Sequence, residues 1–307
     1  MKKICLEYSD MLVTLPSIEF FLDKIENNES FQFLRANHGI FDIMYNAYQN
    51  DNVFNYNEFK YDLNAKSYNK ISQLAFTNSN KEYHRVFSQF HKDNNKLIAK
   101  FAVFLKVFNE YKDISDKFEI SVSLGVGLNL FWGVWHKEHH LQIGRTDVFK
   151  SFYESRYYDY HYSGVLKYFS VSGEIFKLFD TINKNDYNVV IVGPDYMRLY
   201  EGVLDIRNFN HINIPTSGAI DFVDGYIEQI KNIAKFKKTI VFYSIGHILT
   251  FYMAYHLRDE HIIGIDIGRS FDILLKDKLT TETTLTECWI NLNKDDLKGH
   301  INRVRNG

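Results

Sequence analysis

Asn188–Gly193 has the sequence NVVIVG and is followed at once by Pro194. A short apolar run that ends in Gly-Pro is typical of a strand buried inside a parallel sheet. Runs of the same kind recur further along the chain, at Phe209–Ile214 (FNHINI), Lys238–Tyr243 (KTIVFY) and His261–Ile265 (HIIGI). The spacing leaves room for a helix between consecutive runs, which indicates a repeated strand–helix–strand unit.

The segments between these runs have helical character. Asp195–Leu204 follows the first run, and a segment that ends at Leu257 follows the third. The segment after the second run has apolar residues at helical spacing and can be capped by Thr216 or Ser217. Its apolar residues are Ile220, Val223, Ile227, Ile230 and Ile233. This alternation predicts an α/β fold, with a Rossmann-like parallel sheet and right-handed crossovers in the C-terminal half.

The first half of the chain has a different pattern, mostly helical and rich in aromatic residues. Helices are expected at Ser17–Glu26, at Gly39–Tyr48 and within residues 81–112, and residues 120–135 contain one or two strands broken by glycines. We therefore expect three regions along the chain. They are a mostly helical, aromatic-rich region packed on the sheet (1–186), the Rossmann-like α/β unit (187–291) and a polar, basic tail (292–307).

The composition excludes several classes of function. The 307 residues carry 36 Lys+Arg against 38 Asp+Glu, and this balance argues against a protein that grips nucleic acid by neutralising phosphates. Two cysteines, Cys5 and Cys288, are too few for a disulfide framework or a thiolate metal cluster. No apolar run approaches the ~20 residues of a membrane span, and the start MKKICLEYSD does not resemble a signal peptide. We expect a soluble, cytoplasmic protein, either a monomer or a homo-oligomer.

Candidate binding residues follow each predicted strand. Ligands of parallel α/β sheets bind beyond the carboxyl ends of the strands. The segments at those ends are Gly193–Asp195, Pro215–Gly218, Ser244–His247 and Asp266–Asp272. At Ser244–His247 a strand turns into a helix, whose unpaired N–H groups attract a phosphate. Simple capping of that helix is the alternative explanation.

The most informative of these segments is Asp266-Ile-Gly-Arg-Ser-Phe-Asp272. It places two carboxylates six residues apart, with Gly268 available for a tight turn. Carboxylates at this edge can hold a divalent cation, which in turn holds a diphosphate. Alternatively, Asp266 caps a turn through its own backbone.

Two other patterns are weaker. Gly125-Val-Gly127 lacks the third glycine of a dinucleotide fingerprint, because position 130 is Leu, and it is more typical of a bulged strand. His136, His139 and His140 can share one helix face, but no acidic residue completes an HExxH-like pattern. We expect these histidines to be exposed to solvent.

Asp266–Asp272 resembles the D-I-G-x-x-F-D signature of the GT-D-type glycosyltransferases. Upstream, Val190–Pro194 (VIVGP) is similar to the first nucleotide-edge strand of that family, and Ile214–Ala219 (IPTSGA) is similar to its strand-to-helix junction. Phe242–Gly246 (FYSIG) stands where the family has a turn before the helix that leads to the acidic motif. Near the N-terminus, Phe31–Gly39 (FQFLRANHG) resembles the R-x-G-D-G-E entry motif.

This resemblance implies transfer of a sugar from a nucleotide-sugar donor to a glycan or glycoconjugate acceptor. It implies that Asp266 and Asp272 are catalytic and hold Mn²⁺ or Mg²⁺ on the diphosphate, and His247 or Asp195 would assist the acceptor hydroxyl as a base. The residues expected to bind the donor are Arg35, Gly193, Asp195, Ser217, Ser244 and Gly246.

The chain also departs from the family pattern. His38-Gly-Ile40 replaces the D-G-E carboxylates, and Leu274 stands where some members carry an acid. Either a divergent enzyme uses the two remaining aspartates, or the chain keeps the fold as a binding or structural protein without the chemistry. Another Rossmann-like transferase, such as a methyltransferase, is the third alternative, although only Gly193 supplies a glycine after the first strand.

Overall fold

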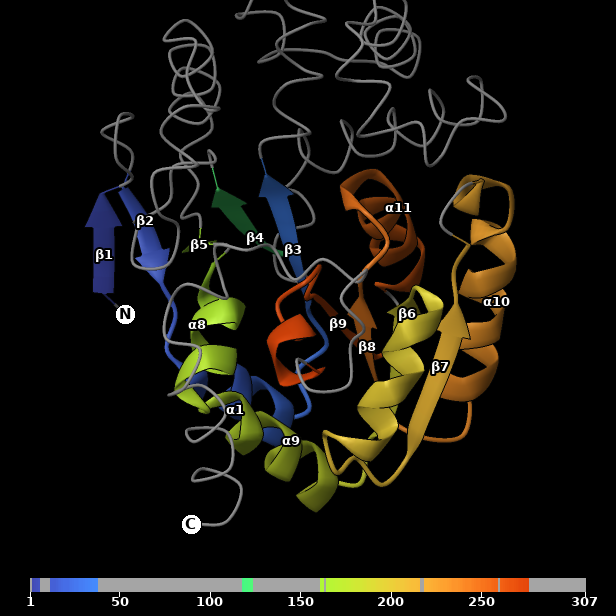
Figure 1. Cartoon of the computed structure of the whole chain (residues 1–307), viewed down its shortest axis with the longest axis horizontal. Coiled ribbons are helices and arrows are strands. Elements are labelled where there is room, and N and C mark those ends of the chain that lie inside the picture. The colour runs from blue at the N-terminus through green and yellow to red at the C-terminus, as the bar shows by residue number, and fades with distance from the viewer. Residues whose placement is uncertain are drawn as a thin grey trace, which may run out of the picture.

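A computed structural model of the chain describes residues 2–5, 12–37, 118–123, 161–162, 164–215, 218–258 and 260–275. Its strands are β1 (Lys2–Cys5), β2 (Leu12–Leu15), β3 (Gln32–Asn37), β4 (Phe118–Ser123), β5 (His161–Tyr162), β6 (Asn188–Gly193), β7 (Phe209–Asn213), β8 (Thr239–Tyr243) and β9 (Ile262–Asp266). They form one nine-stranded sheet in the order β1-β2-β5-β4-β3-β9-β8-β6-β7 (Figure 1). Neighbouring strands are parallel, except for the antiparallel pair β1–β2 at one edge.

The strands predicted in the C-terminal half are present as β6, β7, β8 and β9, each with ends within one residue of the predicted ones. Two helices connect them, α10 (Val223–Ala234) before β8 and α11 (His247–Leu257) before β9. Every residue of β8 and β9 is buried, as is typical of parallel strands covered on both faces. The predicted α/β fold with a parallel sheet is confirmed.

Three short 3₁₀ helices lie among the longer elements. The segment after β6 is the 3₁₀ helix η4 (Asp195–Gly202), where an ordinary helix was expected. The turn η5 (Ala219–Asp221) precedes α10, which begins at Val223. A third, η6 (Asp272–Leu275), follows β9. Such tight turns are frequent as connectors between longer elements.

The N-terminal part of the chain supplies both helices and strands. The predicted helix at Ser17–Glu26 is present as α1 (Ile18–Glu26), and α8 (Val165–Ser172) and α9 (Ile175–Lys184) lie before β6. The strand β3 pairs with β9 on one side and with β4 along its whole length on the other. The sheet therefore continues beyond the C-terminal half. Of its additional strands, β4 overlaps the start of the strand region expected at 120–135, whereas β1, β2, β3 and β5 were not predicted.

Both faces of the sheet are covered by helices. Alternate residues of β6, β8 and β9 join α1, α8 and α9 in one apolar cluster, in which Phe179 lies edge-on to Phe242 and Phe271. The intervening strand residues, such as Val190 and Val241, are also fully buried. Because successive side chains of a strand point to opposite faces, these residues face the side where α10 contacts β6 and α11 contacts β3 and β9.

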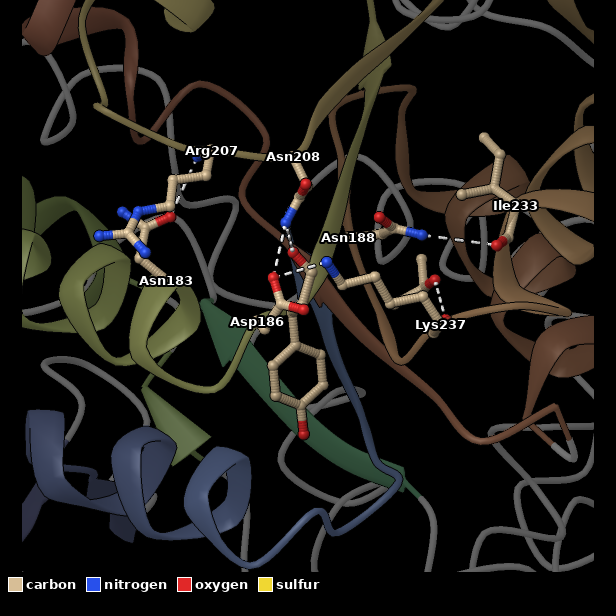
Figure 2. A network of polar contacts seen from close by, with 9 residues as sticks. Asn183, Asp186, Asn188, Arg207, Asn208, Ile233 and Lys237 are labelled. Carbon is tan, nitrogen blue, oxygen red and sulfur yellow. Dashed lines mark hydrogen bonds and ion pairs between the residues drawn. The ribbon is translucent and has the colours of Figure 1, made fainter.

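A network of polar contacts fastens the turns at the amino ends of β6, β7 and β8 (Figure 2). The Asp186 carboxylate accepts hydrogen bonds from Asn208 at 3.1 Å and from Lys237 at 2.6 Å. Nearby, Asn183 accepts a hydrogen bond from the backbone N–H of Arg207 at 3.1 Å. These contacts join three turns at the amino ends of the strands, whereas the predicted site lies at the carboxyl ends. We therefore assign them a structural role.

Several predictions fall on residues outside the described ranges. They are the helices at 39–48 and within 81–112, the glycine pair at 125–127, the histidines at 136–140 and the tail at 292–307. Among the helices that are described, none combines the length and apolar character needed to cross a membrane.

Candidate functional site

The carboxyl ends of four parallel strands meet at one edge of the sheet. In the register of the sheet, Val192 of β6 is the partner of Tyr243 of β8, and Tyr243 is the partner of Asp266 of β9. On the other side of β9, Phe33 of β3 is the partner of Ile265, so that Arg35 lies just beyond the end of β9. This register brings the predicted residues of distant segments to one place.

Arg35 and Asp266 form a buried ion pair at this edge. The Arg35 Nε lies 3.1 Å from Asp266 Oδ1, and the two side chains are only 11% and 3% exposed. The backbone N–H of Gly268 donates to the same oxygen at 3.0 Å. Asp266 therefore caps its own turn, as the alternative explanation predicted, and at the same time holds the arginine.

Gly268 is required by this arrangement for two reasons. Its φ is +45°, a left-handed backbone conformation that side chains with a Cβ rarely adopt. A Cβ built on Gly268 would also overlap the guanidinium of Arg35. The turn is also held to the end of β8, because the N–H groups of Ile267 and Gly268 both donate to the Tyr243 carbonyl, at 3.0 and 3.1 Å.

Ser244 connects this turn to the end of β6. Its hydroxyl donates to the Gly268 carbonyl at 2.6 Å, and its backbone N–H donates to the Val192 carbonyl at 2.8 Å. A Cβ added at Gly193 would lie 3.2 Å from the Ser244 Cβ, so these two residues are in close contact. Arg35, Asp266, Gly268, Ser244 and Gly193 thus form one connected group, hereafter the edge cluster.

A buried polar pair that the sequence did not suggest lies beneath the edge cluster. The Tyr243 hydroxyl donates to Gln32 Oε1 at 3.2 Å, and Gln32 Nε2 donates to the Ile262 carbonyl at 3.0 Å. Burial, together with the negative charge of Asp266, raises the pKa of Tyr243 far above its usual value. The only sequence signal was a Gln and a Tyr inside otherwise apolar strands.

Asp272 has a separate set of partners. Together with Tyr196, Tyr200 and Arg269 it forms a group that we call the clasp. Its Oδ1 accepts hydrogen bonds from the hydroxyls of Tyr196 at 2.9 Å and Tyr200 at 3.2 Å, and its Oδ2 lies 2.6 Å from Arg269 Nε. Burial, reinforced by the charge of Asp272, raises the pKa values of both tyrosines, so their hydroxyls stay protonated and donate. The clasp joins η4 to η6.

The contacts of Asp272 do not fit a divalent cation, and Asp266 already holds a guanidinium through one of its oxygens. Mg²⁺ and Mn²⁺ need about six oxygen ligands, of which the protein supplies carboxylates that are open to the ion. Both oxygens of Asp272 accept hydrogen bonds, and one oxygen of Asp266 faces Arg35. In the described part of the chain, no group of three or more His, Cys, Asp or Glu residues could hold a metal. The assignment of Mn²⁺ or Mg²⁺ to Asp266 and Asp272 stays a prediction without support from these contacts.

Comparison with solved structures identifies the fold. One match is a new glycosyltransferase (DUF1792) from Streptococcus sanguinis, which is 12% identical, with 90% of this chain and 92% of that chain aligned and a TM-score of 0.51. A second is a selenomethionine-substituted structure of the domain of unknown function 1792, also 12% identical, with 90% and 88% aligned and a TM-score of 0.50. The chain has the DUF1792 fold. No protein-family model matches the sequence, and no curated protein does.

The match agrees, at the level of the fold alone, with the architecture that the motif resemblance implied. It leaves the roles of individual residues as predictions. Asp195, at the start of η4, is exposed and lies 3.5 Å from Arg198. Gly246 immediately precedes α11 and has a φ of +83°. His247 is the first residue of α11, although its side chain lies outside the described part, as does the whole of Ser217.

Proposed function

We propose that this protein transfers a sugar from a nucleotide-sugar donor to a glycan or glycoconjugate acceptor. The observation that carries the proposal is the edge cluster. It gathers Arg35, Ser244 and the turn at Asp266–Gly268 at the carboxyl edge of a parallel sheet, where α/β folds bind their ligands. The likeness to a glycosyltransferase from Streptococcus sanguinis supports the same reaction class.

The chemistry of the cluster suits an anionic leaving group. Transfer breaks the bond between the sugar anomeric carbon and the diphosphate oxygen, so negative charge grows on the nucleoside diphosphate. Asp266 orients Arg35 through Nε, and among the described residues the terminal nitrogens of Arg35 form no hydrogen bond. A guanidinium presented in this way can donate two parallel hydrogen bonds to a phosphate. The start of α11, directly after Ser244–Gly246, adds backbone N–H groups, whose partial positive charge also favours a phosphate.

The acceptor must lose a proton as it attacks. The acceptor oxygen forms the new bond to the anomeric carbon, and its proton passes to a base. We assign this role to His247, because it is the first residue of α11 and directly follows the turn at Ser244–Gly246. Asp195, the first residue of η4 after β6, is the alternative base.

A second function is favoured by one specific observation. Both aspartates of the acidic motif are buried against arginines, an arrangement that also suits a protein that keeps the fold and a nucleotide pocket without catalysis. Such a protein would bind nucleotide-sugars and turn none of them over.

Calorimetry with UDP-, GDP- and TDP-sugars, followed by an assay for nucleotide release, tests both functions. We expect one donor to bind and to be consumed when an acceptor glycan is supplied. Gly268→Ala should weaken binding about tenfold or more, because the new Cβ displaces the Arg35 guanidinium and removes a charge-assisted contact. Gly225→Ala, in α10 with nothing near its added Cβ, is the matched control and should bind normally.

The outcomes separate the two candidates. Binding of a donor without turnover of any acceptor supports the non-catalytic protein. If no nucleotide-sugar binds to the folded chain, sugar transfer is excluded and so is the binding role.

A further inference from the structure

The two aspartates of the acidic motif are both neutralised by the protein itself. The side chain of Asp266 is 3% exposed beside Arg35, and that of Asp272 is 4% exposed beside Arg269. In each pair the arginine is the more exposed partner, at 11% for Arg35 and 47% for Arg269. The groups nearer to solvent at this turn are therefore cations, whereas a carboxylate site for a metal would present anions.

Both cations adjoin the same turn. The guanidinium of Arg35 lies against Gly268, and Arg269 is the next residue of the chain. Arg269 is held in place by Asp272, which the hydroxyls of Tyr196 and Tyr200 fix from the other side. The clasp thus positions Arg269, as Asp266 positions Arg35.

We infer that Arg35 and Arg269 supply the positive charge that meets the donor diphosphate, and that donor binding uses no divalent cation at Asp266 or Asp272. This inference rests on the proposed function. A dication at Asp272 would have to displace Arg269 or the two tyrosine hydroxyls from a carboxylate that is almost fully buried. A dication at Asp266 would lie beside the Arg35 guanidinium, and the two positive charges would repel each other. A guanidinium can offset the charge of a leaving diphosphate without such a displacement, because its N–H groups match phosphate oxygens in pairs.

Asp272 is accordingly a positioning residue, and its substitution separates the two alternatives. As a metal ligand, it would make the affinity for a nucleotide depend on Mn²⁺, and Asp272→Asn would remove that dependence. As the anchor of Arg269, it would weaken binding to the same extent with and without the metal. The ratio of the Kd measured without metal to the Kd measured with metal therefore distinguishes these roles. A purely structural effect on folding does not change this ratio.

The test uses the full chain, with UDP, GDP and TDP as probes, titrated in EDTA and again in Mn²⁺ or Mg²⁺. For the nucleotide that binds, we expect Kd values within about twofold of each other in the two conditions, since the cations of the protein do not depend on added metal. The double substitution Arg269→Gln with Asp272→Asn keeps the clasp neutral and hydrogen-bonded, so that folding is preserved. It should weaken binding about tenfold and make the affinity less sensitive to salt.

Arg207→Gln is the matched control, because Arg207 is an exposed arginine at the opposite edge of the sheet (Figure 2). It should change neither the affinity nor its dependence on salt. Binding that requires Mn²⁺, and that loses this requirement in Asp272→Asn, would overturn the inference while leaving sugar transfer standing. If no nucleotide binds in either condition, the proposed function fails and the inference fails with it.

Discussion

At the scale of single residues, a neighbour from a distant segment can leave space only for glycine at a position inside a strand. Gly264 lies in β9, where Gln32 of β3 crosses over it to reach Tyr243. A Cβ at Gly264 would overlap Gln32 Oε1 and lie 2.7 Å from the Tyr243 ring. The sequence places this glycine in an apolar run, but only the pairing of β3 with β9 explains why no larger residue fits there.

We predict that Gly264→Ala lowers the free energy of unfolding by about 1–3 kcal/mol, the usual cost of overpacking a core. Gly225→Ala should raise it by about 0.5–1 kcal/mol, since Gly225 is inside α10 and its added Cβ meets nothing. Urea denaturation of the two variants beside the unchanged chain measures both effects. Equal stability of the two variants would show that Gln32 moves aside without cost.

At the scale of elements, the clasp determines how η4 and η6 are held together. These short 3₁₀ helices follow different strands, and the hydroxyls of Tyr196 and Tyr200 reach across to Asp272. The sequence predicted that Asp272 ends the acidic motif but did not identify its partners. The sequence of a connecting segment does not show whether the hydroxyl of a tyrosine forms a hydrogen bond or its ring only packs against neighbours.

We predict that Tyr200→Phe destabilises the protein by about 1.5–3 kcal/mol, because it removes a hydrogen bond to a buried carboxylate and leaves the ring contacts in place. Tyr226→Phe in α10 is the control and should have little effect, since the described residues include no hydrogen-bond partner for that hydroxyl. Urea denaturation gives the free energies. A loss no greater than that of the control would mean that Tyr196 and Arg269 hold Asp272 without help from Tyr200.

At the scale of the whole molecule, buried tyrosines link stability to alkaline pH. Burial is the first cause that raises the pKa values of Tyr196, Tyr200 and Tyr243, with the nearby aspartates adding to it. In the unfolded chain a tyrosine titrates near a pKa of about 10. Below that pH both states are protonated, and the folded state keeps its full stability.

We therefore expect the free energy of unfolding to fall as the pH rises above about 10, because the unfolded chain then releases protons that the folded protein retains. Urea denaturation across this range, with the ultraviolet absorbance of tyrosinate as a second signal, measures the fall. Tyr243→Phe should make it shallower by removing one of the linked groups. A slope unchanged by this substitution would show that Tyr243 does not contribute.

The sequence alone determined the order of strands and helices from Asn188 to Asp266 and the edge of the sheet where ligands would bind. Those features follow from local patterns, since a buried strand and an amphipathic helix each show their character within a few residues. Its short motifs also indicated the fold that the solved structures confirm.

Only the tertiary structure decided which groups meet at that edge. Arg35 and Asp266 are 231 residues apart in the chain, and the pairing of β3 with β9 brings them within 3.1 Å. The same is true of Asp272, whose charge is balanced by Arg269 and whose carboxylate accepts hydrogen bonds from two tyrosines of η4. The charge state and availability of a carboxylate depend on its neighbours in space, and no spacing of residues along the chain records them.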